Sequence, residues 1–273
     1  MKLFKYVHPQ RIDILENKMI CFSTPHQLND PFELNPHIKD VASQETYNSS
    51  IKEEVAKLRG DYSKLSRNSR RTMTFDDFSR QVSYFTHKGL TSEVKLGMTM
   101  KAKEIIDKEL TGKTGILSLT ERPDNLLMWA HYADSHQGFI IEFDPESSFF
   151  NQRRSNIDEY GYLREVKYSE TRPSLILEEI KDLSPYLTKG NVWKPECEWR
   201  MMLPIYMRNK ELSCGHNLFS FPALAIKSII FGCRTTDITK NKVKEAIKNN
   251  PEFLHVKLMT ASIDQEHYRI NID

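Results

Sequence analysis

The chain has 273 residues, of which 39% are hydrophobic and 28% charged, and its formal net charge at pH 7 is +2. These values are typical of a globular protein. The net charge is too small to attract the chain as a whole to nucleic acid or to a membrane surface. The sequence has no apolar signal segment, no stretch of membrane-spanning length and only scattered cysteines. We therefore expect a cytoplasmic protein with reduced thiols and no membrane partner.

The start of the chain alternates between strand and helix patterns. Residues 2–7 alternate like a short strand, and residues 9–18 place apolar side chains at helical spacing. Residues 19–23 follow as a second strand, which ends in a proline-containing loop where Asn29 and Asp30 predict an Asx-type turn. This opening indicates a fold that mixes helices and strands.

Residues 46–112 carry three predicted helices and little strand pattern. The second helix can be capped by Thr74, and its apolar stripe consists of Phe75, Phe78, Val82 and Phe85. A basic stretch lies between the first two helices and contains Lys57, Arg59, Lys64, Arg67, Arg70 and Arg71. Such a run is usually a solvated face, and contact with a nucleic acid or an acidic partner is the alternative. We interpret the segment as a helical insertion.

Strand patterns return after the insertion. The next predicted strands are 115–120 and 139–144, with a helix predicted over 123–138 between them. The remaining predicted elements are strands at 198–204 and 226–232, a helix at 236–249, and closing strands at 254–259 and 268–272. The sequence thus predicts a single α+β domain over 1–273, with a split mixed β-sheet core and a helical insertion at about 46–112.

Two glutamates and an arginine occupy alternate positions in the stretch KPECEWRMMLPI. Read as a strand, this stretch directs Glu196, Glu198 and Arg200 to one face and the apolar side chains to the other. Like charges this close repel each other, so the pair is either neutralised by cations such as Arg200 or meets a cationic ligand. The first interpretation is a surface or edge strand whose carboxylates pair with Arg200 and a lysine. The second is a carboxylate site that stabilises an oxocarbenium-like transition state.

Other candidate site residues lie on the predicted strands. Ser118 and Thr120 alternate on one strand and can orient an amide or a ribose, although such a pair is as often a polar strand face. Tyr6, next to Lys5 in the first strand, is ordinarily a core residue. Two aromatic residues of the predicted helix over 123–138 are also expected in the core: Trp129 and Tyr132.

Several stretches together resemble a known family. They are LFKYV…ILENKMICFSTPHQLNDPFE, LSLTERPDNLLMWAHYADSHQGFIIEFD, WKPECEWR and IKSIIFG, in this order. The combination resembles a widespread microbial family catalogued as domain-of-unknown-function family 2971. The resemblance covers most of the chain outside about 46–112. It implies no activity, because the family is defined without one.

A second resemblance implies an activity. The mono-ADP-ribosyltransferase fold divides its NAD site among an Arg, His or Tyr of the first strand, a Ser-Thr-Ser-like strand, and a later strand with a Glu, often as Glu-x-Glu. The similar order here is Lys5 or Tyr6, then Ser118 and Thr120, then Glu196 and Glu198. The usual first-strand Arg or His is absent. The resemblance implies NAD as substrate and a protein, a nucleic acid or water as acceptor. By analogy it also implies a toxin or anti-phage effector role.

The same resemblance implies individual roles. Glu198 would be the catalytic residue that stabilises the ribose cation, and Glu196 would orient or deprotonate the acceptor. Arg200 would position Glu198. The implied cofactor-binding residues are Tyr6, Lys5, Ser118, Thr120 and Arg200. No metal is implied.

Two alternatives stay open. A metal-dependent nuclease or phosphodiesterase would use hard oxygen ligands for Mg²⁺, and the basic insertion would hold the nucleic-acid backbone. The candidate ligands are Asp30, Glu33, Glu142, Asp144, Glu196 and Glu198. Against this hypothesis, the sequence places an arginine rather than a lysine beside Glu198. The other alternative is a non-catalytic binding protein, in which the stretches NDPFE and MWAHY only stabilise the fold.

Overall fold

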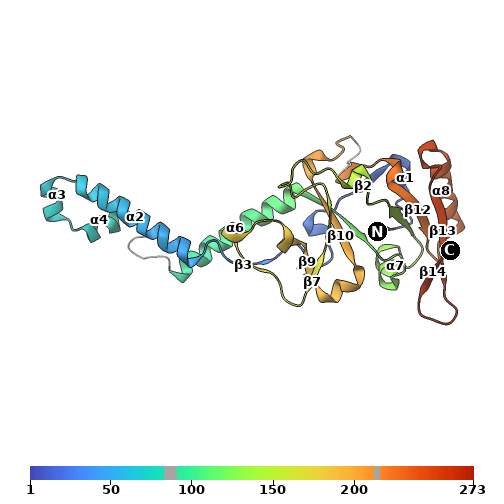
Figure 1. Cartoon of the computed structure of the whole chain (residues 1–273), viewed down its shortest axis with the longest axis horizontal. Helices are drawn as coiled ribbons and strands as arrows, with labels where there is room; N and C mark the ends of the chain where they lie inside the picture. Colours follow the sequence, from blue (N-terminus) through green and yellow to red (C-terminus); the bar gives the residue numbers. More distant parts are fainter. Residues whose placement is uncertain (83–90, 212–215) are drawn as a thin grey trace. The chain divides into compact units, whose positions relative to one another are not determined.

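A computed structural model describes residues 1–82, 91–211 and 216–273. The chain divides into two compact units, whose elements are labelled in Figure 1. Unit 1 comprises residues 1–35, 109–172 and 183–273. Unit 2 comprises residues 36–108 and 173–182. None of the helices in the described residues is both long enough and apolar enough to cross a membrane.

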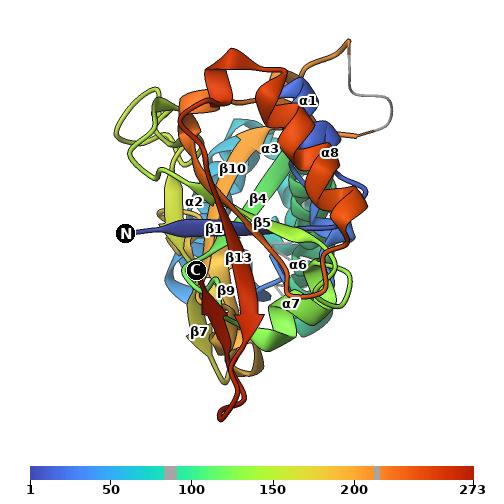
Figure 2. The same cartoon turned by 90° about the vertical axis from the view of Figure 1, so that its right-hand side faces the viewer.

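Unit 1 is built on a mixed sheet that has eight strands in the described residues. The strands are β1 (Leu3–Val7), β4 (Thr114–Thr120), β5 (Phe139–Phe143), β6 (Leu163–Glu165), β10 (Glu198–Pro204), β12 (Ile226–Phe231), β13 (Lys257–Ile263) and β14 (Ile270–Ile272). Their order is β14-β13-β12-β5-β1-β4-β10-β6. Neighbours run antiparallel except for the parallel pair β12–β13. Figure 2 shows β1, β4, β5, β10 and β13 in this sheet.

Apolar clusters cover both faces of the sheet, because successive strand residues point to opposite sides. Ile141 and Ile229 belong to the larger cluster, which includes residues of α1 and α8. Ile140 and Ile230 belong to the smaller cluster with Trp129 of α7. The helices are α1 (Asp13–Asn17), α7 (Leu126–Tyr132) and α8 (Asp237–Lys248). A sheet buried on both faces explains why β5 reads FIIEF and is buried at every position.

Short elements complete unit 1. Two small sheets are formed by β2 (Met19–Cys21) with β11 (Leu218–Ser220), and by β7 (Lys167–Ser169) with β9 (Thr188–Gly190). The 3₁₀-helices are η1 (Pro25–Gln27), η2 (Ser148–Phe150), η4 (Ser184–Leu187), η5 (Asn191–Glu196), η6 (Ile205–Met207), η7 (Ala223–Ala225) and η8 (Pro251–Phe253).

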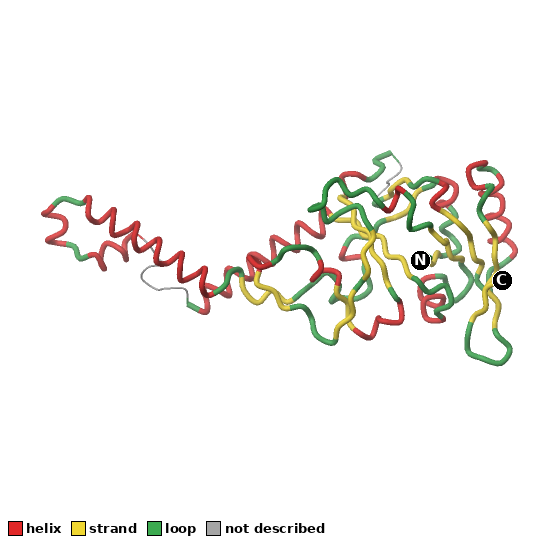
Figure 3. Tube along the Cα trace, viewed as in Figure 1, coloured by secondary structure: helices red, strands yellow, loops and turns green. Residues whose placement is uncertain are grey.

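Unit 2 is mostly helical (Figure 3). Its elements are β3 (His37–Asp40), α2 (Gln44–Lys64), α3 (Arg67–Thr72), α4 (Phe75–Val82), α6 (Ser92–Lys113, whose last residues belong to unit 1), β8 (Ser174–Ile176) and η3 (Leu177–Glu179). The predicted cap of α4 is confirmed, because the Asp77 amide donates to the Thr74 hydroxyl at 3.1 Å. Phe85 of the predicted stripe lies outside the described residues.

The predicted α+β class, with a mixed sheet and a helical insertion, is confirmed. The core, however, is one continuous large sheet rather than a split one. The sequence also gave no sign that residues 173–182 belong with the insertion, where β8 pairs in parallel with β3. This pairing joins segments more than a hundred residues apart, and no local pattern encodes it.

The helix predicted over 123–138 is shorter than expected. It ends at Tyr132, because Asp134, Ser135 and His136 take left-handed φ angles of 48°, 54° and 71°. Gly138 follows, where an added Cβ would lie 2.1 Å from the Val7 carbonyl oxygen. The turn therefore requires a residue without a side chain at this position.

Candidate functional site

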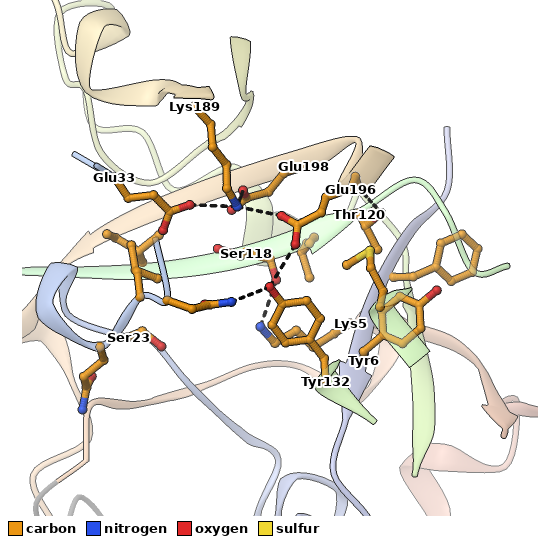
Figure 4. Close-up of a pocket in the computed structure, with 17 residues that line it drawn as sticks. Lys5, Tyr6, Ser23, Glu33, Ser118, Thr120, Tyr132, Lys189, Glu196 and Glu198 are labelled. Carbon is orange, nitrogen blue, oxygen red and sulfur yellow. Dashed lines mark hydrogen bonds and ion pairs between the residues drawn. The ribbon is translucent and has the colours of Figure 1, made fainter. Parts of the chain in front are cut away.

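A cavity of about 340 Å³ lies in unit 1 beside strands β1, β4 and β10. Six residues that the sequence singled out as catalytic or cofactor-binding line it: Lys5, Tyr6, Ser118, Thr120, Glu196 and Glu198. We call it the Glu198 cavity. Figure 4 shows these side chains together with Glu33, Tyr132 and Lys189, which also line the cavity.

The sheet register brings four of the predicted positions together. Thr120 of β4 pairs with Glu198 of β10 on one side and with Phe4 of β1 on the other. Ser118 lies opposite Arg200 in the same antiparallel ladder. Because residues two apart on a strand share a face, the hydroxyl pair and the Glu–Arg pair meet along β4 and β10.

Glu196 reaches the cavity by another route than the one predicted. It is the last residue of η5, so the prediction that it shares a strand with Glu198 is wrong. Cys197 takes a left-handed φ of 45° between the two glutamates, and β10 begins only at Glu198. The Thr120 hydroxyl donates to the Glu196 carbonyl at 2.5 Å and holds this turn against β4. A turn, not strand alternation, directs both carboxylates to one cavity.

A buried lysine joins the glutamates, and the sequence did not reveal it. Lys189 Nζ lies 2.8 Å from Glu33 Oε1, 2.6 Å from Glu196 Oε2 and 3.0 Å from Glu198 Oε2. Arg200, not a lysine, neighbours Glu198 along β10, as the sequence shows, and Lys189 reaches the glutamates from a different strand. Lys189 comes from the three-residue strand β9, which has no distinctive sequence pattern, and lysine is ordinarily an exposed residue.

Arg200 lies behind the cavity and is 1% exposed. Its Nε donates to Glu198 Oε1 at 2.6 Å, and its Nη2 donates to Glu33 Oε1 at 2.5 Å and to Glu198 Oε2 at 2.9 Å. Arg200 does not line the cavity, so the prediction that it contacts a cofactor is corrected. Arg200 holds Glu198 and Glu33 in place, in line with the prediction that it positions Glu198.

These contacts set the charge states of the cluster. Burial alone would raise the pKa of Glu198, but the Arg200 guanidinium, followed by Lys189, lowers it to about 2. Burial likewise opposes the charge of Lys189, yet Glu198, Glu33 and Glu196 raise its pKa above the ordinary value. The same balance raises the pKa of Arg200. Glu198, Lys189 and Arg200 are therefore charged at neutral pH.

Lys5 differs from the other two cations of the site. Its Nζ donates to the Ser118 carbonyl oxygen at 3.0 Å, and it pairs with no carboxylate among the described residues. Burial lowers the pKa of Lys5, with Glu198 and Glu196 only partly opposing this effect. An anionic ligand group beside Lys5 would favour its charged form.

Tyr6 lines the cavity with its ring rather than with a free hydroxyl. Its hydroxyl donates to the Arg122 carbonyl at 2.7 Å, and its ring packs edge-on against Trp129 with centroids 5.2 Å apart. Burial raises the pKa of Tyr6. A ligand in the cavity would therefore meet the ring of Tyr6, because its hydroxyl donates to the Arg122 carbonyl. Trp129 is fully buried, which confirms its predicted place in the core.

Tyr132, expected in the core, belongs to the site. Its hydroxyl donates to Glu196 Oε1 at 2.9 Å and accepts from Asn29 Nδ2 at 2.8 Å. Burial raises the pKa of Tyr132 to about 12, so this hydroxyl stays protonated at neutral pH. Tyr132 is the last residue of α7, and neither apolar spacing nor a sequence motif identifies it as a site residue.

Of the six ligands proposed for a metal-dependent nuclease, only Glu33, Glu196 and Glu198 come together, and all three pair with Lys189. Glu33 lines the Glu198 cavity, but Asp30, Glu142 and Asp144 do not. Asp30 accepts from the Phe32 amide at 2.9 Å, as the predicted Asx-type turn requires, while Glu142 and Asp144 form ion pairs elsewhere. Among the residues that the structure describes, no group of three or more His, Cys, Asp and Glu side chains is arranged to hold a metal ion.

The match to a known family covers part of this site. Residues 128–201 match a family described as protein of unknown function (DUF2971). The predicted resemblance to this family is thereby confirmed over a segment that includes Tyr132, Lys189, Glu196 and Glu198. Comparison with the curated proteins and with the solved structures gives no match.

Proposed function

We propose that the chain is an ADP-ribosyltransferase-like enzyme that binds NAD in the Glu198 cavity and breaks the bond between nicotinamide and ribose. ADP-ribose then passes to a protein or nucleic-acid acceptor, or to water. The observation that carries the proposal is that one cavity contains both an excess of carboxylates and an unpaired lysine. NAD carries a cationic nicotinamide ring, which suits the carboxylates, and an anionic pyrophosphate, which suits the lysine.

The formal charge and the volume of the cavity both support NAD as the ligand. Three glutamates (Glu33, Glu196 and Glu198) form ion pairs with two cations (Lys189 and Arg200), so this cluster, counted without Lys5, carries one formal negative charge. A net negative site favours a ligand that is cationic or becomes so during the reaction. The volume of about 340 Å³ is near the lower end of the roughly 300–1,000 Å³ of small-molecule pockets. This size suits the nicotinamide–ribose part, with the rest of the dinucleotide outside.

The chemistry requires a fixed anion beside the ribose. When the C1′–N bond breaks, its electron pair goes to the ring nitrogen, nicotinamide leaves as a neutral molecule, and the ribose becomes positively charged. Glu198 would stabilise this charge, since Arg200 holds it ionised and in one orientation. The nucleophile then bonds to C1′ and gives up its proton to Glu196.

Lys5 would bind the pyrophosphate. It is the cation lining the cavity that pairs with no described carboxylate. It lies on the first strand, where the mono-ADP-ribosyltransferase fold has an Arg, His or Tyr. We expect Lys5→Met to weaken NAD binding about tenfold or more, the scale of one charge-assisted hydrogen bond. The affinity for nicotinamide riboside, which has no pyrophosphate, should not change. Isothermal titration with both ligands measures the difference.

The deciding experiment measures nicotinamide release from NAD by chromatography, normalised to the folded fraction of each variant. Glu198→Gln should lower turnover by about 10² or more, with a much smaller change in NAD affinity. The matched control is Glu142→Gln, since Glu142 is a buried glutamate of the same sheet that does not line the cavity. The control should retain turnover. Absence of NAD binding by the wild type, or full turnover in Glu198→Gln, would refute the proposal.

A further inference from the structure

Positive charge is concentrated in a short part of unit 2. Residues 57–71 contain six lysine and arginine side chains and one aspartate, a formal charge of +5. The whole chain carries +2, so the residues outside this stretch sum to −3. This local concentration of charge distinguishes the stretch from the near-neutral surface expected of the chain as a whole.

Three arginines of this stretch share one face of α3. Arg67, Arg70 and Arg71 stand at positions i, i+3 and i+4, which lie on the same side of a helix with Cβ atoms about 5–6 Å apart. All three are exposed, and none forms an ion pair with a described residue. Lys64, by contrast, pairs with Asp61 at 2.9 Å. We call the three residues the arginine face.

The arginine face is held by well-packed neighbours. The Ser66 hydroxyl caps α3 by accepting from the Ser69 amide at 3.1 Å. The Tyr62 hydroxyl donates to the Met73 carbonyl at 2.7 Å, which joins the end of α2 to the residue after α3. The Tyr62 ring also packs edge-on against Phe75 of α4, with centroids 5.7 Å apart. The three guanidinium groups therefore project from a backbone that these contacts hold in one conformation. Less backbone entropy is then lost when a ligand binds. Within unit 2, α3 lies at the end of the helical segment, where the chain passes from α2 to α4 (Figure 1).

We propose that the arginine face binds the phosphodiester backbone of a nucleic acid without sequence preference. Arginine presents a planar fork of donors that fits phosphate oxygens, and three such forks at close spacing fit a polymer with a phosphate at every residue. An acidic protein segment offers carboxylates at less regular spacing. No exposed aromatic side chain lies among residues 57–71, so backbone contact is favoured over base stacking. The proposal does not depend on NAD chemistry.

Fluorescence anisotropy with the full chain tests this inference. The probes are a labelled duplex DNA and a labelled single-stranded RNA, both 20-mers of mixed sequence, titrated between 50 and 200 mM salt. The variant is the triple substitution Arg67→Gln, Arg70→Gln and Arg71→Gln. Each lost phosphate contact lowers the salt exponent for duplex DNA by about 0.9, so three lower it by about 2.7. Over this salt range, the affinity of the variant should change about 40-fold less than that of the wild type.

The matched control removes three exposed lysines of α8: Lys242→Gln, Lys244→Gln and Lys248→Gln. This variant has the same net charge as the arginine variant and should bind both probes with nearly the wild-type salt dependence. Stronger binding of one probe would identify DNA or RNA as the preferred ligand. Equal loss in both variants would overturn the proposal, because net charge alone would then explain binding. Failure of the wild type to bind at 50 mM salt, or equal competition by poly-glutamate, would also overturn it.

Discussion

Replacement of Glu198 by glutamine should destabilise unit 1, whatever the protein's reaction. Glu198 is 4% exposed and is a partner of both buried cations, Arg200 and Lys189. Its pKa of about 2, instead of the ordinary 4.5, is equivalent to about 3 kcal/mol of folding free energy. Breaking a buried ion pair typically costs about 3–5 kcal/mol. We expect the lower end of that range, because Glu33 still pairs with both cations in the variant.

Urea unfolding followed by tryptophan fluorescence measures this loss in unit 1, since Trp129, Trp193 and Trp199 all lie there. The folded pKa of Glu198 is below the unfolded one, so its stabilising contribution is complete above about pH 4.5 and is lost as the pH falls toward 2. The stability difference between wild type and Glu198→Gln should therefore shrink across this interval.

The control for this prediction is Glu146→Gln, which changes an exposed glutamate of the same unit. Its free energy of unfolding should stay within about 0.5 kcal/mol of wild type. Equal stability of Glu198→Gln and wild type at pH 7 would refute the reasoning. A stability difference that persists unchanged at pH 2 would refute it as well, because the effect would not then come from the charge of Glu198.

Three further predictions concern two glycines and one helix cap. Gly138→Ala should unfold or strongly destabilise unit 1, because its Cβ would lie 2.1 Å from the Val7 carbonyl oxygen. Gly60→Ala, with open space around the new Cβ inside α2, should stabilise unit 2 by about 0.5–1 kcal/mol, and circular dichroism during thermal unfolding compares the two variants. Asn125→Ala should cost about 1–2 kcal/mol in urea unfolding, because Asn125 caps α7 and also donates to the Pro195 carbonyl at 2.8 Å. Wild-type stability in Asn125→Ala would contradict that role.

Local patterns in the sequence were sufficient to predict many elements and part of the candidate site. Alternation identified β10 and its pair Glu198 and Arg200, and the same rule placed Ser118 and Thr120 on a second strand. Alternation depends only on the two-residue period of a strand, so a single segment is enough to reveal it. The α+β class followed in the same way from successive strand and helix patterns.

The remaining parts of the site depend on contacts between distant segments. Lys189 and Tyr132 became recognisable as site residues only when β9 and α7 were placed beside β10, and Glu196 depends on a left-handed turn at Cys197. Arg200 changed from an expected ligand contact to a buried support for the same reason. Burial and ion pairing depend on the surroundings of a side chain in three dimensions, and a linear pattern does not specify those surroundings.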